Sequence, residues 1–67
     1  MTLKVTVNGR PVEVRADRLD RLLEEVGSEA KWVATAVNGE FVARGDRPST
    51  AIVDGDRIEI VAPMEGG

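Results

Sequence analysis

The sequence contains no cysteine and no histidine, and this double absence removes several kinds of chemistry. Catalysis by a cysteine–histidine pair and metal binding through imidazole are excluded, since neither side chain is present. A small secreted scaffold held together by disulfides is excluded for the same reason. Aromatic residues are almost as scarce, with no tyrosine, one tryptophan and one phenylalanine. The core must therefore be built from valine, leucine, isoleucine and alanine.

Long apolar runs and clustered basic residues are also missing. No stretch approaches the roughly 18 apolar residues of a membrane-spanning helix, and residues 1–7 alternate instead of forming the apolar segment of a secretory signal. Nine Lys and Arg against twelve Asp and Glu give a net charge of -3. The basic residues are scattered, without the basic stripe and stacking aromatics of a nucleic-acid binder. We therefore expect a cytoplasmic protein with neither a nucleic-acid nor a membrane partner.

The chain of 67 residues is near the lower size limit for a domain that folds unaided. Such a domain has no room for a deep pocket that encloses both a substrate and catalytic groups. The glycine-rich fingerprints of phosphate binding are absent too, so we expect no bound nucleotide. These features favour a protein that offers a binding surface, and they argue against an enzyme.

Two Asn-Gly pairs each lie between segments in which apolar residues recur with a period of two. Residues 3–7 and 11–15 flank Asn8-Gly9, and residues 31–44 contain two further segments around Asn38-Gly39. Asn-Gly tolerates the positive φ angles of a two-residue hairpin turn. The pattern predicts two β-hairpins.

A last strand is predicted at residues 57–62, with Ile58 and Ile60 on one face and Val61 on the other. It follows Asp54-Gly55-Asp56, which lacks the further ligands of a calcium-binding loop. A turn is the favoured interpretation of this tripeptide, so no metal site is predicted.

One amphipathic helix is predicted between the hairpins, because apolar residues recur there at i, i+3, i+4 and i+7 (Leu19, Leu22, Leu23 and Val26). Asp17 is expected to cap its N-terminus, and Gly27 to follow its C-cap. A domain with one hairpin, one amphipathic helix and three further strands must bury the apolar stripe of the helix against one face of its sheet. We therefore predict an α+β domain over residues 1–62, with one main helix packed on a mixed five-stranded sheet. If the first and last strands pair in parallel, this is the β-grasp, or ubiquitin-like, arrangement.

The sequence ends Pro63-Met64-Glu65-Gly66-Gly67. Proline lacks a ladder donor and is expected to end the last strand. The four residues after it would reach about 13–14 Å when extended. Since the two glycines have no Cβ, they could pass through a channel too narrow for other residues. We expect residues 63–67 to form a flexible tail that presents the carboxylate of Gly67 to a second protein; the alternative is an ordinary frayed terminus.

A contact surface for that second protein is predicted beside the tail. Alternation places Phe41 and Val61 on the sheet face away from the helix, and Met64 follows them in the tail. The alternative for Phe41 is that it fills a corner of the core. Trp32, near a strand start, is expected to be partly buried in the core or packed against the helix, and a platform for a ligand is the less favoured alternative.

Five stretches resemble one known family: VNG at 7–9, LLEEVG at 22–27, AVNGEFVAR at 36–44, DGDRIEIV at 54–61 and PMEGG at 63–67. They run from end to end of the chain in the expected order. The sequence is similar to the ThiS family, the ubiquitin-like sulfur carrier proteins of thiamine biosynthesis. One departure is Arg47, because members often carry a tryptophan soon after the position of Arg44.

The resemblance implies a reaction in which this chain is a co-substrate with no catalytic residue of its own. A ThiF-like activating enzyme would use ATP and Mg²⁺ to adenylate Gly67. A sulfur donor such as the persulfide of a cysteine desulfurase would displace AMP and leave a thiocarboxylate. Thiazole synthase would then take the sulfur into the thiazole ring. ATP and Mg²⁺ would bind to the activating enzyme, and no cofactor is expected on this chain.

Four other functions share features of this sequence. Sulfur carriers for molybdopterin and for tRNA thiolation have the same kind of tail and mechanism, and a protein-conjugating modifier is related to them. A non-covalent ubiquitin-like binding module is the alternative from a different class. Deletion of Gly67 separates the classes, because a carrier would lose its function while the binding module would keep it.

Overall fold

The computed structural model describes residues 1–27 and 32–62. They form one sheet with two short helices on one of its faces. The elements are β1 (Leu3–Val7), β2 (Arg10–Val14), α1 (Leu19–Glu25), β3 (Ala34–Val37), β4 (Glu40–Val42), the 3₁₀ helix η1 (Arg44–Ser49) and β5 (Arg57–Val61). The strand order is β2-β1-β5-β3-β4. Neighbours are antiparallel except for the parallel pair β1–β5. The predicted α+β class, the mixed five-stranded sheet and its central parallel pair are therefore confirmed.

Both predicted hairpins form around their Asn-Gly turns. Asn8 and Asn38 adopt φ angles of 52° and 53°, in the left-handed region that this kind of turn requires. In the first hairpin Val7 lies opposite Arg10, so that only two residues separate the strands. The second hairpin repeats this two-residue turn between β3 and β4. The turn thus sets the register of each pair.

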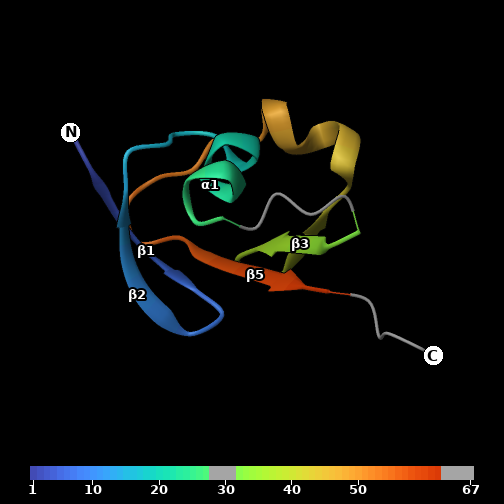
Figure 1. Cartoon of the computed structure of the whole chain (residues 1–67), viewed down its shortest axis with the longest axis horizontal. Helices are drawn as coiled ribbons and strands as arrows, with labels where there is room; N and C mark the ends of the chain where they lie inside the picture. The colour runs from blue at the N-terminus through green and yellow to red at the C-terminus, as the bar shows by residue number, and fades with distance from the viewer. Residues whose placement is uncertain (28–31, 63–67) are drawn as a thin grey trace.

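Helix α1 lies across one face of the sheet, and η1 lies on the same side (Figure 1). The predicted apolar stripe faces inward, with Leu19 and Leu22 fully buried. They form one core with buried residues of the sheet and of the segment before β5 (Val5, Val14, Ile52 and Ile58). Ile60 packs against this core while Val61 is exposed, as the alternation predicted. Neither α1 nor η1, the helices of the part that the structure describes, is long and apolar enough to cross a membrane.

The predicted N-cap of α1 is wrong by one residue. The N-cap is Arg18, and its side chain makes no capping hydrogen bond. The reason lies in a distant segment: the Leu19 N–H donates to the carbonyl of Thr50 at 3.0 Å, and the Asp17 carbonyl accepts from the Ile52 N–H at 2.9 Å. A backbone bridge thus binds the first N–H of the helix, at the end that a carboxylate was expected to cap.

The 3₁₀ helix η1 was not predicted, and it contains the buried Arg47, which is only 7% exposed. Arg47 Nε donates to Thr35 Oγ1 at 3.1 Å and its Nη2 donates to the Val33 carbonyl at 2.7 Å. Thr35 Oγ1 in turn donates to the Val42 carbonyl at 2.9 Å. This chain of polar contacts joins η1 to β3 and β4. The residue that departs from the family pattern therefore has a structural role in this loop.

Candidate functional site at the end of the central strand

The central strand β5 ends at Val61, and the predicted functional tail begins two residues later. Met64, Glu65, Gly66 and Gly67 lie outside the residues that the structure describes. Their roles as attachment site and tail therefore remain predictions. What the structure gives is the strand that carries them, the backbone that holds this strand and the surface around its end.

On the side of β3, the end of β5 is held by a regular antiparallel ladder. Ala34 lies opposite Val61, and Ala36 lies opposite Glu59. On the side of β1, the paired backbone positions are Thr6 with Arg57 and Val7 with Ile58, further from the strand end. The strand end is therefore paired more extensively by backbone on one side than on the other.

The side chain of Asn8 occupies the gap on the β1 side. Its Oδ1 accepts a hydrogen bond from the Ile60 N–H at 2.8 Å, and its Nδ2 donates to the Ile60 carbonyl at 3.0 Å. Sequence reasoning assigned Asn8 only to a turn and missed this contact, because no local pattern connects residues 52 positions apart.

Asn38 makes a comparable contact at the other end of β5. Its Oδ1 accepts from the Arg57 N–H at 2.9 Å, and its Nδ2 donates to Oδ1 of Asp56 at 2.9 Å. Asp56 is itself buried, and its Oδ2 accepts from the Val53 N–H at 2.9 Å. The side chains of both turn asparagines thus hold β5, one near each end.

A largely apolar surface with one acidic residue lies on the sheet face opposite α1. The strand register and the alternation of side chains place Phe41, Ala36, Ala34 and Val61 on that face, and these four residues are called the open-face patch. The exposed Glu59, which lies opposite Ala36, is on the same face. Phe41 is 72% exposed and Val61 is exposed as well, while Val42 turns toward the core. The alternative that Phe41 fills a corner of the core is wrong for this reason. Its predicted role as a partner contact stays a prediction.

Trp32 is 73% exposed, so its predicted burial in the core is wrong. The adjacent Val33 carbonyl is bound by Arg47, and this buried guanidinium occupies the space between β3 and η1. Trp32 comes two residues before Ala34, which pairs with the end of β5. A second exposed aromatic residue therefore lies just before the start of β3.

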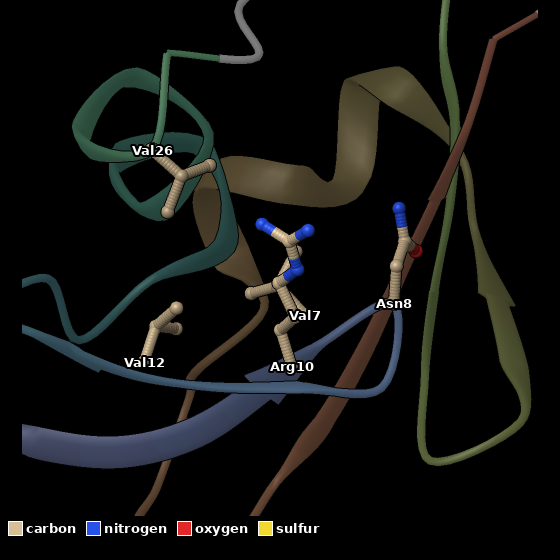
Figure 2. A pocket seen from close by; sticks show the side chains of 5 residues that line it. All are labelled: Val7, Asn8, Arg10, Val12 and Val26. Atoms are coloured by element: carbon tan, nitrogen blue, oxygen red, sulfur yellow. The ribbon is translucent and has the colours of Figure 1, made fainter.

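A surface hollow of about 480 Å³ lies on the other side of the sheet, between the first hairpin and the end of α1 (Figure 2). Its apolar residues are the half-buried Val7, Val12 and Val26, and Arg10 and Asn8 add polar groups. Because Val7 and Val12 pack against the core, the hollow belongs to the helix-covered side. It shares no residue with the open-face patch. Within residues 1–27 and 32–62, no cluster of three or more acidic residues could hold a metal ion.

Comparison with known proteins decides the family. The model of the ThiS family matches residues 5–67. The chain belongs to the ThiS family. Over 63 residues it is 40% identical to the sulfur carrier protein ThiS of Thermus thermophilus, covering 94% of this chain and 98% of that protein. The resemblance inferred from the sequence motifs is confirmed, and so is the predicted role as a sulfur carrier of thiamine biosynthesis.

Two further relatives place this ThiS-family chain in context. It is 33% identical to the thiamine biosynthesis protein ThiS of Geobacter metallireducens, whose crystal structure superposes with a TM-score of 0.82 over 97% of this chain and 100% of that one. It is also 35% identical, over 66 residues, to a thiazole synthase of Paramagnetospirillum magneticum, covering 97% of this chain but 20% of that protein. A segment similar to this whole chain therefore forms a fifth of that relative. The β-grasp fold agrees with both the sequence motifs and the solved structure.

Proposed function

We propose that this sulfur carrier transports sulfur as a thiocarboxylate on Gly67 and is a co-substrate, not an enzyme. The observation that carries the proposal is the family match, which extends through Gly67, six residues beyond the last residue of the central strand β5. The folded domain supplies the binding surface for partner proteins, and the tail supplies the reacting group. Catalytic groups and the nucleotide site then belong to the partners.

The chemistry requires activation before sulfur can be added. A carboxylate is a poor electrophile, because its negative charge repels nucleophiles and its leaving group would be oxide. Attack of the Gly67 carboxylate on ATP gives an acyl adenylate and pyrophosphate. A persulfide sulfur then attacks the carbonyl carbon, AMP leaves, and an acyl disulfide forms. A second thiol reduces the sulfur–sulfur bond, which releases the thiocarboxylate and a disulfide.

Three partners follow from this sequence of steps. A ThiF-like adenylating enzyme would bind ATP and Mg²⁺, a cysteine desulfurase or another donor would supply the persulfide, and thiazole synthase would accept the sulfur. The relative in which a similar segment is part of a thiazole synthase supports the last of these. Joining two proteins in one chain raises their effective concentration for each other, which is useful when one must repeatedly serve the other.

The open-face patch is proposed as the docking surface for the adenylating enzyme, together with Met64 of the tail. Val61 is both a member of the patch and the last residue of β5. A partner that covers the patch would therefore hold the domain at the point where the tail departs. Gly66 and Gly67 would enter the active site of the partner, and Met64 and Glu65 would span the distance between the two.

The experiment that tests the proposal is mass spectrometry of the intact chain after incubation with a ThiF-like enzyme, MgATP, a persulfide donor and a thiol that reduces the acyl disulfide. We expect a mass gain equal to one exchange of oxygen for sulfur, located at Gly67 by fragmentation. The control is a chain that lacks Gly67, which should stay folded and show no gain. If the native chain gains no sulfur, or gains it elsewhere, the proposal is wrong. An unchanged function of the shortened chain would favour the non-covalent binding module.

A further inference from the structure

We infer that Asn8 is a positioning residue for the modification of Gly67. Its side chain takes the place of missing β1 backbone and fixes the end of β5, from which the tail departs. This inference rests on the proposed function and concerns a residue that the reaction itself does not use.

The hydrogen-bond pattern between β1 and β5 shows what is missing. The Thr6 N–H donates to the Asp56 carbonyl at 3.0 Å, and the Asn8 N–H donates to the Ile58 carbonyl at 2.9 Å. In a parallel ladder that continued, the Ile60 N–H would bond the backbone carbonyl of residue 8, and the Ile60 carbonyl would accept from the N–H of residue 10. The chain instead turns back at Asn8, whose φ is 52°, and Arg10 belongs to β2.

The amide of Asn8 supplies both missing groups. Oδ1 replaces the backbone carbonyl as acceptor for the Ile60 N–H, and Nδ2 replaces the missing N–H as donor to the Ile60 carbonyl. Figure 2 shows the Asn8 side chain pointing along the neighbouring strand from the turn of the first hairpin. The side chain therefore acts as one additional peptide group of β1, and it extends the parallel pairing almost to the end of β5.

The consequence for the tail follows from the alternation of partners along β5. In this register the backbone N–H and carbonyl groups of Glu59 and Val61 face β3. Those of Ile60 face β1, where the side chain of Asn8 is their partner. Without the amide, the last residues of β5 are attached on one side only and can fray. Each residue that frays must be ordered again when the tail enters a partner, and ordering the backbone of one residue lowers the productive population about fivefold or more. A modest increase in fraying should therefore slow the modification of Gly67 measurably.

The chain contains a matched control for Asn8. Asn38 is also followed by glycine and has a similar φ of 53°. Its amide Oδ1 accepts from the first residue of β5, Arg57, and its Nδ2 donates to the side chain of the preceding Asp56. Its contacts lie at the start of β5, on Arg57 and Asp56, away from the tail. Replacement of either asparagine by glycine removes the same atoms and keeps a residue that tolerates the positive φ angle.

The test compares Asn8→Gly and Asn38→Gly in the full chain by urea unfolding, by hydrogen exchange of the Ile60 amide, and by kinetics of sulfur loading with an adenylating enzyme. We expect Asn38→Gly to lose at least as much stability as Asn8→Gly, because it also leaves Oδ1 of the buried Asp56 without its Asn38 partner. Only Asn8→Gly should lower the protection of Ile60 relative to Ile58 by about tenfold, and only this variant should lower kcat/KM for loading, by about fivefold to tenfold. Asn38→Gly should load like the native chain while both are folded.

Several outcomes would overturn the inference. Unchanged protection of Ile60 in Asn8→Gly would show that the amide does not anchor the strand. An equal loss of sulfur loading in the two variants would show that loading falls because the whole domain is less stable, and not because the end of β5 frays. Should Asn8→Gly fail to fold, Asn8→Asp provides the same test, since it keeps the acceptor and replaces the donor with an oxygen that faces the Ile60 carbonyl. If the native chain is not loaded at all, the proposed function fails, and the exchange of Ile60 still decides whether Asn8 holds the strand.

Discussion

Replacement of Phe41 by alanine should weaken partner binding far more than it weakens the fold. Phe41 is 72% exposed, so little of its side chain contributes to the folded domain. A phenylalanine buries about 150–250 Å² when it is fully covered. The covered part of Phe41 therefore amounts to about 50 Å², which corresponds to ~1 kcal/mol of folding free energy at about 25 cal/mol per Å². This is an upper figure for the loss of stability.

The same area argument gives the effect on docking. A partner that covers the exposed part of Phe41 removes about 140 Å² of apolar surface from water, which corresponds to ~3 kcal/mol at the same coefficient. Ordering of side chains and imperfect polar pairing at the interface reduce this figure. We therefore expect a loss of ~2 kcal/mol of binding free energy in Phe41→Ala, which raises Kd about 30-fold.

Isothermal titration calorimetry with a ThiF-like enzyme measures the binding, and urea unfolding measures the stability. Val53→Ala is the matched control, because Val53 is 58% exposed but precedes the turn at the opposite end of β5. It should change Kd less than twofold. The reasoning is refuted if Phe41→Ala destabilises the fold by ~3 kcal/mol or more, or if both variants weaken binding equally.

Two further predictions concern the folded domain. Leu22→Ala should lower the free energy of unfolding by ~3 kcal/mol, because Leu22 is fully buried. This is a large part of the ~3–10 kcal/mol of total unfolding free energy that a domain of this size has. A urea titration that shows a loss below ~1 kcal/mol would contradict the packing. Arg47→Lys should cost ~2 kcal/mol in the same assay, since an ammonium group cannot reproduce both bonds that the guanidinium makes to Thr35 and Val33. The control Arg44→Lys changes an exposed residue and should have almost no effect; equal effects in both variants would rule out the structural role of Arg47.

Much of the fold could be predicted because its signals are local. The two Asn-Gly pairs fix two-residue turns, and a two-residue turn leaves one register for the hairpin that it closes. The spacing of Leu19 and Leu22 fixes the face of α1 that meets the sheet. The parallel pairing of β1 and β5 had a weaker basis, since only the habits of small domains suggested it. The structure confirms this pairing. Its physical reason is that the apolar faces of both strands must meet the same helix.

The wrong prediction at Trp32 and the unpredicted burial of Arg47 have a common cause. Residue type predicts burial only on average, and here the aromatic side chain is exposed while the charged one is buried. Arg47 can be buried because its donors meet Thr35 Oγ1 and the Val33 carbonyl, which satisfies part of its hydrogen-bonding capacity. No pattern in the sequence shows that these acceptors lie within its reach, since Thr35 in β3 and Val33 just before it are 12 and 14 positions away.

Short polar residues show most clearly where local rules stop. Asp17 fits the pattern of an N-cap, yet its side chain caps nothing, and the Leu19 N–H at the start of the helix donates to the carbonyl of Thr50. Asn8 fits the pattern of a turn and does form one, yet its side chain also completes a ladder with Ile60, 52 positions away. In both cases a hydrogen bond expected from the local sequence competes with one to backbone that the fold brings close. The partners within reach decide which bond forms. The local rule therefore predicts the backbone conformation of Asn8 and leaves its partner open. That partner, Ile60, links an ordinary hairpin turn to the strand that precedes the proposed reactive tail.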